Sequence, residues 1–114
     1  MRLFLLFSVL GVLLIAQPER KPDRVISISA ERFTYSPSRI NLKKGELVEF
    51  VLSSEDTDHG FRIPGTSIDV TIPPRGRGVV RVRFVAQEKG QFAFECSHPC
   101  GAGHNLMRGV INVK

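Results

Sequence analysis

The chain has 114 residues, enough for one compact domain and too few for two. Hydrophobic residues make up 42% of it, which is ordinary for a globular protein. The net charge of +5 at pH 7 is modest and scattered along the chain, which argues against a nucleic-acid-binding protein.

The chain opens on an apolar segment. Arg2 is followed by residues 3–16, which carry no charge. A helix of this length reaches roughly 21 Å, whereas a bilayer core is about 30 Å thick. The basic start and the short apolar run favour a signal peptide, with an uncleaved membrane anchor as the alternative. We therefore expect an exported protein, either periplasmic or on the outer face of the cytoplasmic membrane.

Residues 17–24 are polar and contain two prolines, which predicts a linker. Residues 25–114 are then expected to form one domain. Within it, short runs rich in Val, Ile and Phe alternate with turn-forming residues, a pattern typical of β-strands. The expected strands are Val25–Ser29, Arg39–Leu42, Leu47–Ser53, Phe61–Ile63, Ile68–Ile72, Gly78–Val85, Gln91–Glu95 and Val110–Val113.

This region has no sustained helical period, so we expect an all-β domain, an antiparallel sandwich or barrel. Alternation along the expected strands predicts their inward faces. The inward residues include Val48, Phe50 and Leu52 on one strand and Phe92, Phe94 and Cys96 at the end of another. Arg81 and Arg83 occupy the opposite, wet face of theirs.

Residues 96–107 gather the side chains that bind soft metals. Both cysteines, two of the three histidines and the one methionine beyond the initiator lie there: Cys96, His98, Cys100, His104 and Met107. Thiolate, imidazole and thioether together are the ligand set of copper electron-transfer sites. Calcium and magnesium prefer oxygen ligands. Zinc is the rival metal, but it needs no methionine and the spacing is not that of a zinc finger.

The third histidine, His59, follows an expected strand and is flanked by acidic residues. We interpret Glu55, Asp56 and Asp58 as a solvated turn, with the alternative that one of them orients His59.

The second cysteine distinguishes two kinds of copper site. A mononuclear blue-copper site uses one cysteine and leaves the other unexplained. Two cysteines separated by three residues on a tight loop can instead each bridge two copper ions. Each copper would then take one histidine, with a methionine completing one site and a backbone carbonyl the other. The metal-free alternative is a disulfide, the usual state of two cysteines in an exported protein.

The pattern Cys-x3-Cys-Gly-x2-His-x2-Met, preceded by His-Gly-Phe at residues 59–61, resembles the CuA motif of cytochrome c oxidase subunit II. Nitrous oxide reductase carries a related domain. The resemblance covers nearly all of residues 25–114, including the Lys-Lys-Gly-Glu turn at residues 43–46 and the run from Lys89 to Cys96. It implies a cupredoxin-like Greek-key β-sandwich or barrel, either free-standing or singly anchored.

The resemblance also implies a CuA centre of two copper ions. The thiolates of Cys96 and Cys100 would bridge the two ions, and the imidazoles of His59 and His104 would be the terminal ligands. The Met107 thioether and the backbone carbonyl of His98 would be the weak ligands. The side chain of His98 would line the exposed rim. Larger oxidase subunits have a glutamate at the His98 position, and many use a tryptophan for electron entry, which this chain lacks.

The implied function is one-electron transfer, from cytochrome c or another small carrier to a terminal oxidase. No catalytic residues are expected on this chain alone, which could act as the electron-entry subunit of a cytochrome c oxidase. Two alternatives remain. One is a copper chaperone that delivers copper to an oxidase site, and the other is a metal-free, disulfide-bonded cupredoxin module.

Overall fold

The computed structural model describes residue 11 and residues 20–114. The expected signal or anchor segment and linker residues 17–19 lie outside the described residues, residue 11 excepted. Within the described part of the chain, no helix is long and apolar enough to cross a membrane.

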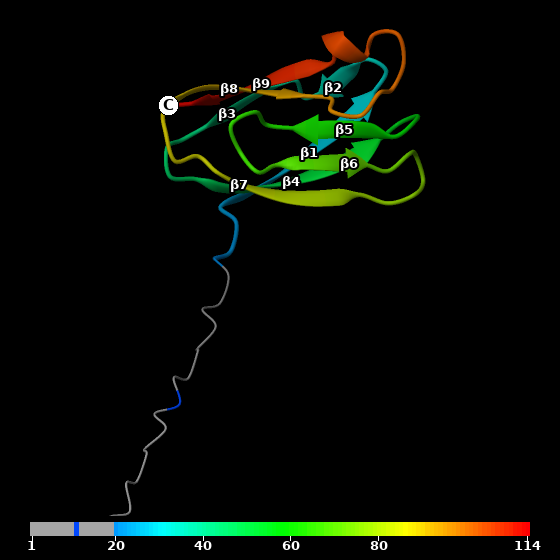
Figure 1. Cartoon of the computed structure of the whole chain (residues 1–114). Helices are drawn as coiled ribbons and strands as arrows, with labels where there is room; N and C mark the ends of the chain where they lie inside the picture. Colours follow the sequence, from blue (N-terminus) through cyan, green and yellow to red (C-terminus); the bar gives the residue numbers. More distant parts are fainter. Residues whose placement is uncertain (1–10, 12–19) are drawn as a thin grey trace, which may run out of the picture.

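Residues 20–114 form nine strands and one 3-10 helix, η1. In chain order these are β1 (Arg24–Glu31), β2 (Thr34–Ser36), β3 (Arg39–Leu42), β4 (Leu47–Ser54), β5 (His59–Arg62), β6 (Asp69–Ile72), β7 (Val80–Val85), β8 (Gly90–Glu95), η1 (His104–Leu106) and β9 (Arg108–Val113). One sheet has the order β2-β1-β4-β7 and the other β3-β9-β8-β5-β6. The expected all-β class is confirmed, and the two sheets form the layers seen in Figure 1.

The core between the sheets is rich in phenylalanine. Phe50 of one sheet lies 5.8 Å from Phe61 of the other, measured between ring centroids, and Phe61 lies 5.1 Å from Phe94. All three side chains are fully buried. Tyr35 closes the cluster edge-on against Phe94, and its hydroxyl donates to the carbonyl of Gly60 at 2.6 Å. The alternation in the sequence therefore predicted the inward faces of β4 and β8.

Two strand pairings differ from the expected antiparallel arrangement. β1 pairs parallel to β4, and β3 pairs parallel to β9. After β2 the chain crosses to the second sheet and returns as β4, so β4 runs in the same direction as β1. Turn residues mark where each strand ends but not which sheet the next strand joins. The antiparallel expectation is wrong for these two pairs.

Two short elements were not expected. β2 has three residues and ends at the Ser36–Pro37 bond, and η1 has only three residues. Neither is long enough to show a period in the sequence. Both matter for the site, since η1 and the β1–β2 turn lie at the same end of the sandwich as the β8–β9 loop (Figure 1).

Candidate metal centre

The two cysteine sulfurs meet inside the β8–β9 loop. Cys96 directly follows β8, and Cys100 lies four residues later on the loop. Both are free thiols with 5% of their surface exposed, and their Sγ atoms are 3.7 Å apart. The Gly60 N–H donates to Cys96 Sγ at 3.3 Å, so β5 contributes a backbone donor to one sulfur. The two sulfurs are therefore buried and adjacent.

His59 faces these sulfurs from the first residue of β5. Its side chain is fully buried, and its Nε2 lies 2.6 Å from Asp56 Oδ1. A ligand nitrogen of its ring lies within 4.8 Å of both cysteine sulfurs. Its Nδ1, alone among buried side-chain nitrogens and oxygens of the described residues, has no hydrogen-bond partner. An unsatisfied buried group of this kind costs about 1–3 kcal/mol, and a metal ion would relieve that cost.

Asp56 is held ionised. Burial raises its pKa, but hydrogen bonds from the Arg32 N–H, the His59 ring and the Thr57 N–H outweigh that and lower the pKa below its ordinary value. An ionised carboxylate on Nε2 keeps the proton of His59 there. The Nδ1 lone pair is then free for a metal, the arrangement found for many metal-bound histidines. The structure thus supports the alternative that an acidic residue orients His59.

The remaining soft ligands converge on Cys100. His104 Nδ1 lies 3.7 Å from Cys100 Sγ, and Met107 Sδ lies 3.9 Å from the same sulfur. Met107 is fully buried, whereas His104 is half-buried. Helix η1 turns the chain between them, and the Cys96 N–H donates to the Met107 carbonyl at 3.2 Å, which closes the loop. These contacts place two imidazoles, two thiols and one thioether together.

His98 divides its two groups between the interior and the rim. Its carbonyl oxygen lies 3.1 Å from Cys96 Sγ, on the sulfur side. Its side chain is 40% exposed and pairs with Asp58, Nε2 to Oδ2, at 2.7 Å. The structure therefore brings every residue of the expected ligand set to one place, with the His98 ring outside that group.

Arg32 also contacts the centre, which the sequence did not predict. Its guanidinium Nε donates to the carbonyl of Cys100 at 2.8 Å across 68 residues of sequence. No periodic or motif signal links the β1–β2 turn to the β8–β9 loop, so only the fold shows this contact.

Burial and mutual contact set the chemistry of the thiols. Burial raises the pKa of Cys100 to about 11, and the hydrogen bond to Cys96 and the negative charge that the Cys96 sulfur carries when ionised add to this shift. The Arg32 charge opposes this shift. The Cys100 thiol is therefore protonated at neutral pH, and metal binding has to release its proton.

Gly60 allows the ligand loop to approach β5. A Cβ at Gly60 would lie 2.5 Å from the Ser97 amide nitrogen and 2.6 Å from that of His98. Real Cβ atoms essentially never come this close to backbone. The glycine of the His-Gly-Phe sequence is thus required by packing between the two ligand-bearing segments.

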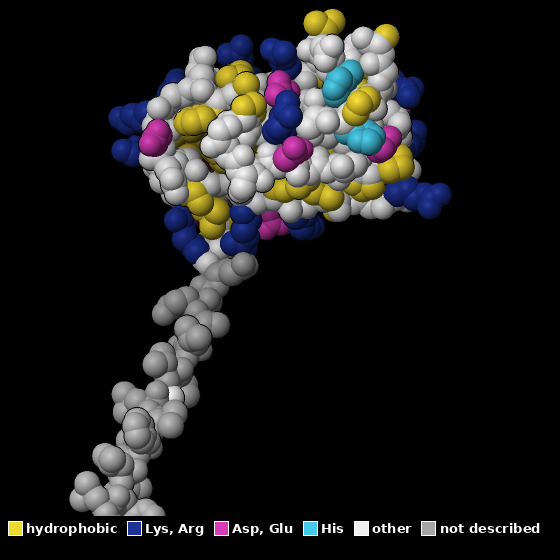
Figure 2. Space-filling view, in the orientation of Figure 1, with side chains coloured by type: hydrophobic (Ala, Val, Ile, Leu, Met, Phe, Trp, Pro, Cys, Tyr) yellow, Lys and Arg dark blue, Asp and Glu magenta, His cyan; other side chains and the backbone are white. Residues whose placement is uncertain are grey.

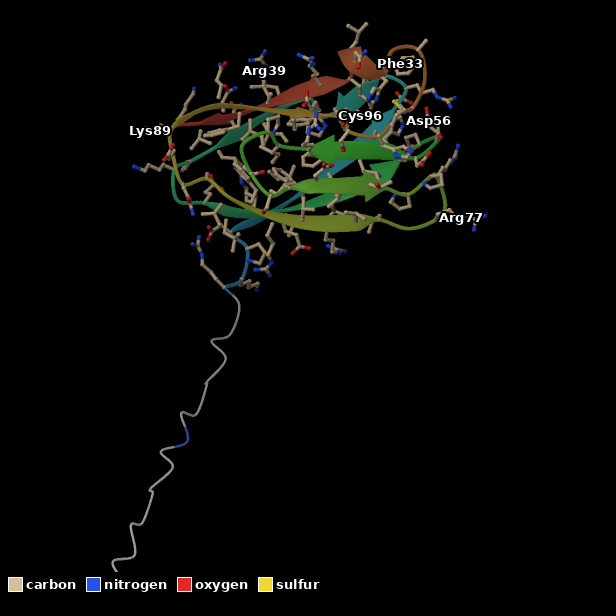
Figure 3. The ribbon with its side chains drawn as sticks, in the orientation of Figure 1. Phe33, Arg39, Asp56, Arg77, Lys89 and Cys96 are labelled. Carbon is tan, nitrogen blue, oxygen red and sulfur yellow. The ribbon has the colours of Figure 1, made fainter. Side chains whose placement is uncertain are left out.

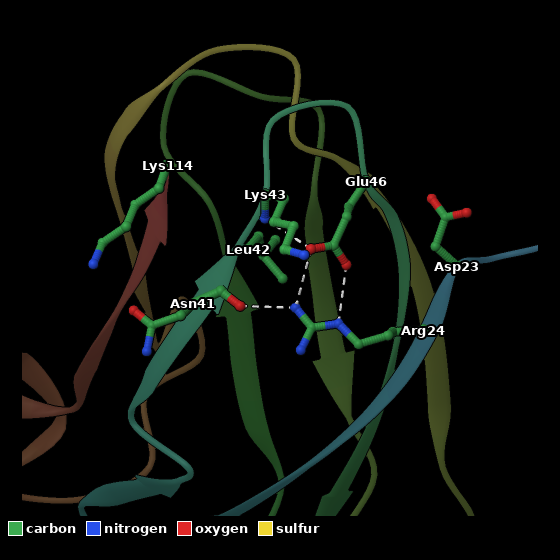
Figure 4. Close-up of a pocket in the computed structure, with 7 residues that line it drawn as sticks. All are labelled: Asp23, Arg24, Asn41, Leu42, Lys43, Glu46 and Lys114. Carbon is green, nitrogen blue, oxygen red and sulfur yellow. Dashed lines mark hydrogen bonds and ion pairs between the residues drawn. The ribbon is translucent and has the colours of Figure 1, made fainter.

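One pocket lies away from the metal centre. It has a volume of about 650 Å³ and is lined by Asp23, Arg24, Asn41, Leu42, Lys43, Glu46 and Lys114 (Figure 4). Arg24 is already paired there with Glu46 at 2.9 Å and with the Asn41 carbonyl at 2.7 Å. The pocket contains none of the candidate ligands.

A smaller pocket of about 220 Å³ borders the metal centre. Its lining includes Cys96, His104 and Met107, together with the ion pair of Arg62 and Glu95. Figure 2 shows histidine side chains at the surface at this end of the molecule. His104 and the side chain of His98 are both partly exposed, and of these two rings the His104 ring belongs to the ligand group.

Comparison with known proteins gives consistent results. A family model described as a cupredoxin-like domain matches residues 3–113. Cytochrome c oxidase subunit 2 of Thermus thermophilus is 35% identical over 89 residues, covering 78% of this chain and 64% of that protein. Nitrous-oxide reductase of Ralstonia nicotianae is 33% identical over 93 residues, covering 78% of this chain and 14% of that protein. The chain thus spans less than two thirds of either relative.

A solved structure supports the fold. The periplasmic domain of subunit II of cytochrome oxidase from Bradyrhizobium japonicum superposes with a TM-score of 0.74 at 18% identity. The match covers 83% of this chain and 86% of that one.

Proposed function

The chain belongs to the cupredoxin-like domain family, and from that premise we propose that it transfers single electrons through a two-copper centre of the CuA type. The observation that carries the proposal is the buried His59 ring, which lies beside two free thiols and whose Nδ1 lacks a hydrogen-bond partner. In a metal-free, disulfide-bonded module this buried nitrogen would stay without a partner. Similarity to subunit 2 of cytochrome c oxidase favours the two-copper centre over a mononuclear one.

Within this proposal, residues 25–114 form the copper-binding domain. Cys96 and Cys100 would be the thiolates shared by the two ions. His59 and His104 would supply the imidazoles, and Met107 and the backbone carbonyl of His98 would be the weak ligands. Bound copper would supply one-electron redox chemistry shared between two ions. The chain's contribution is a rigid β-sandwich that holds soft ligands in a dry pocket, so that little rearrangement accompanies a change of oxidation state.

The proposed route for electrons passes the half-buried edge of His104. Burial excludes water from both cysteines, His59 and Met107, so His104 is the ligand side chain that a partner reaches. We place a small carrier such as cytochrome c on the donor side and a terminal oxidase on the acceptor side. The oxidase assignment draws on the similarity to subunit 2 of Thermus thermophilus. With an oxidase as the acceptor, we place the domain in the periplasm or on the outer face of the cytoplasmic membrane.

Copper loading tests the function. The reduced protein is titrated with copper, freed of excess metal, and analysed for copper per chain and for its optical spectrum. We expect two coppers per chain and a purple, thiolate-dominated spectrum. One tightly held copper with a blue band would indicate a mononuclear centre, and one labile Cu(I) would indicate a delivery protein. No uptake by the fully reduced protein would leave a metal-free module.

A further inference from the structure

We propose that Arg32 is a positioning residue for the metal centre, and that its charge raises the reduction potential of the centre. It would tie together the two segments that carry the ligands. The proposal rests on the copper-binding function proposed above. Arg32 and Phe33, the turn between β1 and β2, are called the clasp below. Figure 3 shows Phe33, Asp56 and Cys96 at the same end of the sandwich, with Lys89 at the other.

The first contact of the clasp is to Asp56, which in turn contacts His59. The Arg32 backbone N–H donates to Asp56 Oδ2 at 2.9 Å. The other oxygen of the same carboxylate lies 2.6 Å from His59 Nε2. The position of the imidazole is therefore set by a carboxylate that is itself fixed by the clasp.

The second contact reaches the cysteine loop. The Arg32 Nε donates to the Cys100 carbonyl at 2.8 Å, a contact that is partly buried. Charged donors make stronger hydrogen bonds than neutral ones, and the guanidinium is always protonated. This bond fixes the peptide of a thiol residue and places a permanent positive charge beside it.

The third contact is steric. The Phe33 ring lies against the ligand loop so closely that a Cβ on Gly101 would lie 3.0 Å from it, and one on Gly103 would lie 2.6 Å from Phe33 Cγ. The two glycines bracket the turn that follows Cys100. The clasp thus contacts the loop at two places, by a hydrogen bond at Cys100 and by ring contact at the glycines beyond it.

These contacts have two consequences for the centre. Because one residue binds both ligand segments, loss of its side chain loosens the loop relative to His59. Because a fixed cation disfavours the more positive, oxidised form of a nearby metal centre, Arg32 raises its reduction potential. Water screens part of this charge, since the side chain reaches the surface. We therefore expect a modest shift.

The test uses three variants. Arg32→Gln removes the charge and the Nε donor, and Arg32→Lys keeps the charge without the planar donor. Arg77→Gln is the matched control, because it removes the same charge from the same end of the molecule but lies apart from the clasp (Figure 3). Reduction potentials are measured on copper-loaded proteins. Amide hydrogen exchange over residues 96–107 is measured on metal-free, reduced proteins.

Arg32→Gln should lower the reduction potential of the centre. The equilibrium constant for accepting an electron from a donor then falls about threefold to tenfold, tenfold being 59 mV for one electron. The same substitution should also speed exchange in residues 96–107 by about tenfold to a hundredfold, as loss of one hydrogen bond to a charged group predicts. Arg32→Lys should recover the potential but not the slow exchange. Arg77→Gln should match the wild type in both.

Unchanged exchange in Arg32→Gln would overturn the positioning role. An unchanged potential, or an equal shift in Arg77→Gln, would overturn the charge effect. Failure of the underlying function is separable, since a wild-type protein that takes up no copper would refute the function while exchange in the metal-free variants still tests the clasp.

Discussion

Replacing Asp56 with asparagine perturbs the centre through one imidazole while every ligand stays in place. Asp56 Oδ1 lies 2.6 Å from His59 Nε2 and accepts from the Thr57 N–H at 2.8 Å, while Oδ2 accepts from the Arg32 N–H at 2.9 Å. An asparagine keeps one acceptor oxygen but has no charge and presents an NH2 group. It no longer fixes the proton on Nε2, so the Nδ1 lone pair is less available.

The expected loss is a 10- to 100-fold weaker copper affinity, about 1.4 to 2.7 kcal/mol, which is the usual effect of losing a partner that orients a metal-bound histidine. Competition with a chelator of known affinity, on the reduced protein, measures it. Glu55→Gln is the control, because Glu55 is the neighbouring acid and its carboxylate contacts Ser29 Oγ at 3.3 Å instead of His59. Affinity in Asp56→Asn within twofold of the wild type would refute the orienting role.

Three further substitutions test the ligand assignments and the packing around them. Cys100→Ser should abolish the two-copper centre, so copper analysis should give at most one ion per chain; retention of both ions would contradict the bridging role. Met107→Leu nearly conserves volume at a fully buried site, so copper should stay bound while the potential shifts, and an unchanged potential would show that the thioether is not a ligand. Gly60→Ala places a Cβ 2.5 Å from the Ser97 amide nitrogen and should destabilise the fold by about 1–3 kcal/mol in chemical denaturation, whereas unchanged stability would mean that the loop yields freely.

Local patterns in the sequence predicted much of this molecule. Alternating apolar residues identified the inward faces of β4 and β8, because a strand places every second side chain on one face. The clustering of soft ligands in residues 96–107 predicted the loop that carries most of the candidate ligands. Both signals come from residues that are close together in the sequence, so they can be read from a single sequence.

Long-range contacts could not be predicted in the same way. The parallel pairings of β1 with β4 and of β3 with β9 depend on how the chain crosses between sheets. The bond from Arg32 to the Cys100 carbonyl joins residues that only the fold brings together. The Asp56–His59 contact could be predicted only in part. The spacing in the sequence allows an acidic residue to contact His59, but it does not show which of Glu55, Asp56 and Asp58 does so.

The paramagnetic spectrum of the copper-loaded protein tests the central claim most directly. The reduced wild-type protein is loaded with copper, brought to its one-electron-oxidised state, and recorded by EPR with the copper content measured on the same sample. We expect two coppers per chain and a seven-line hyperfine pattern from one unpaired electron shared equally between two nuclei. A four-line pattern from a single copper, at any stoichiometry, would contradict it.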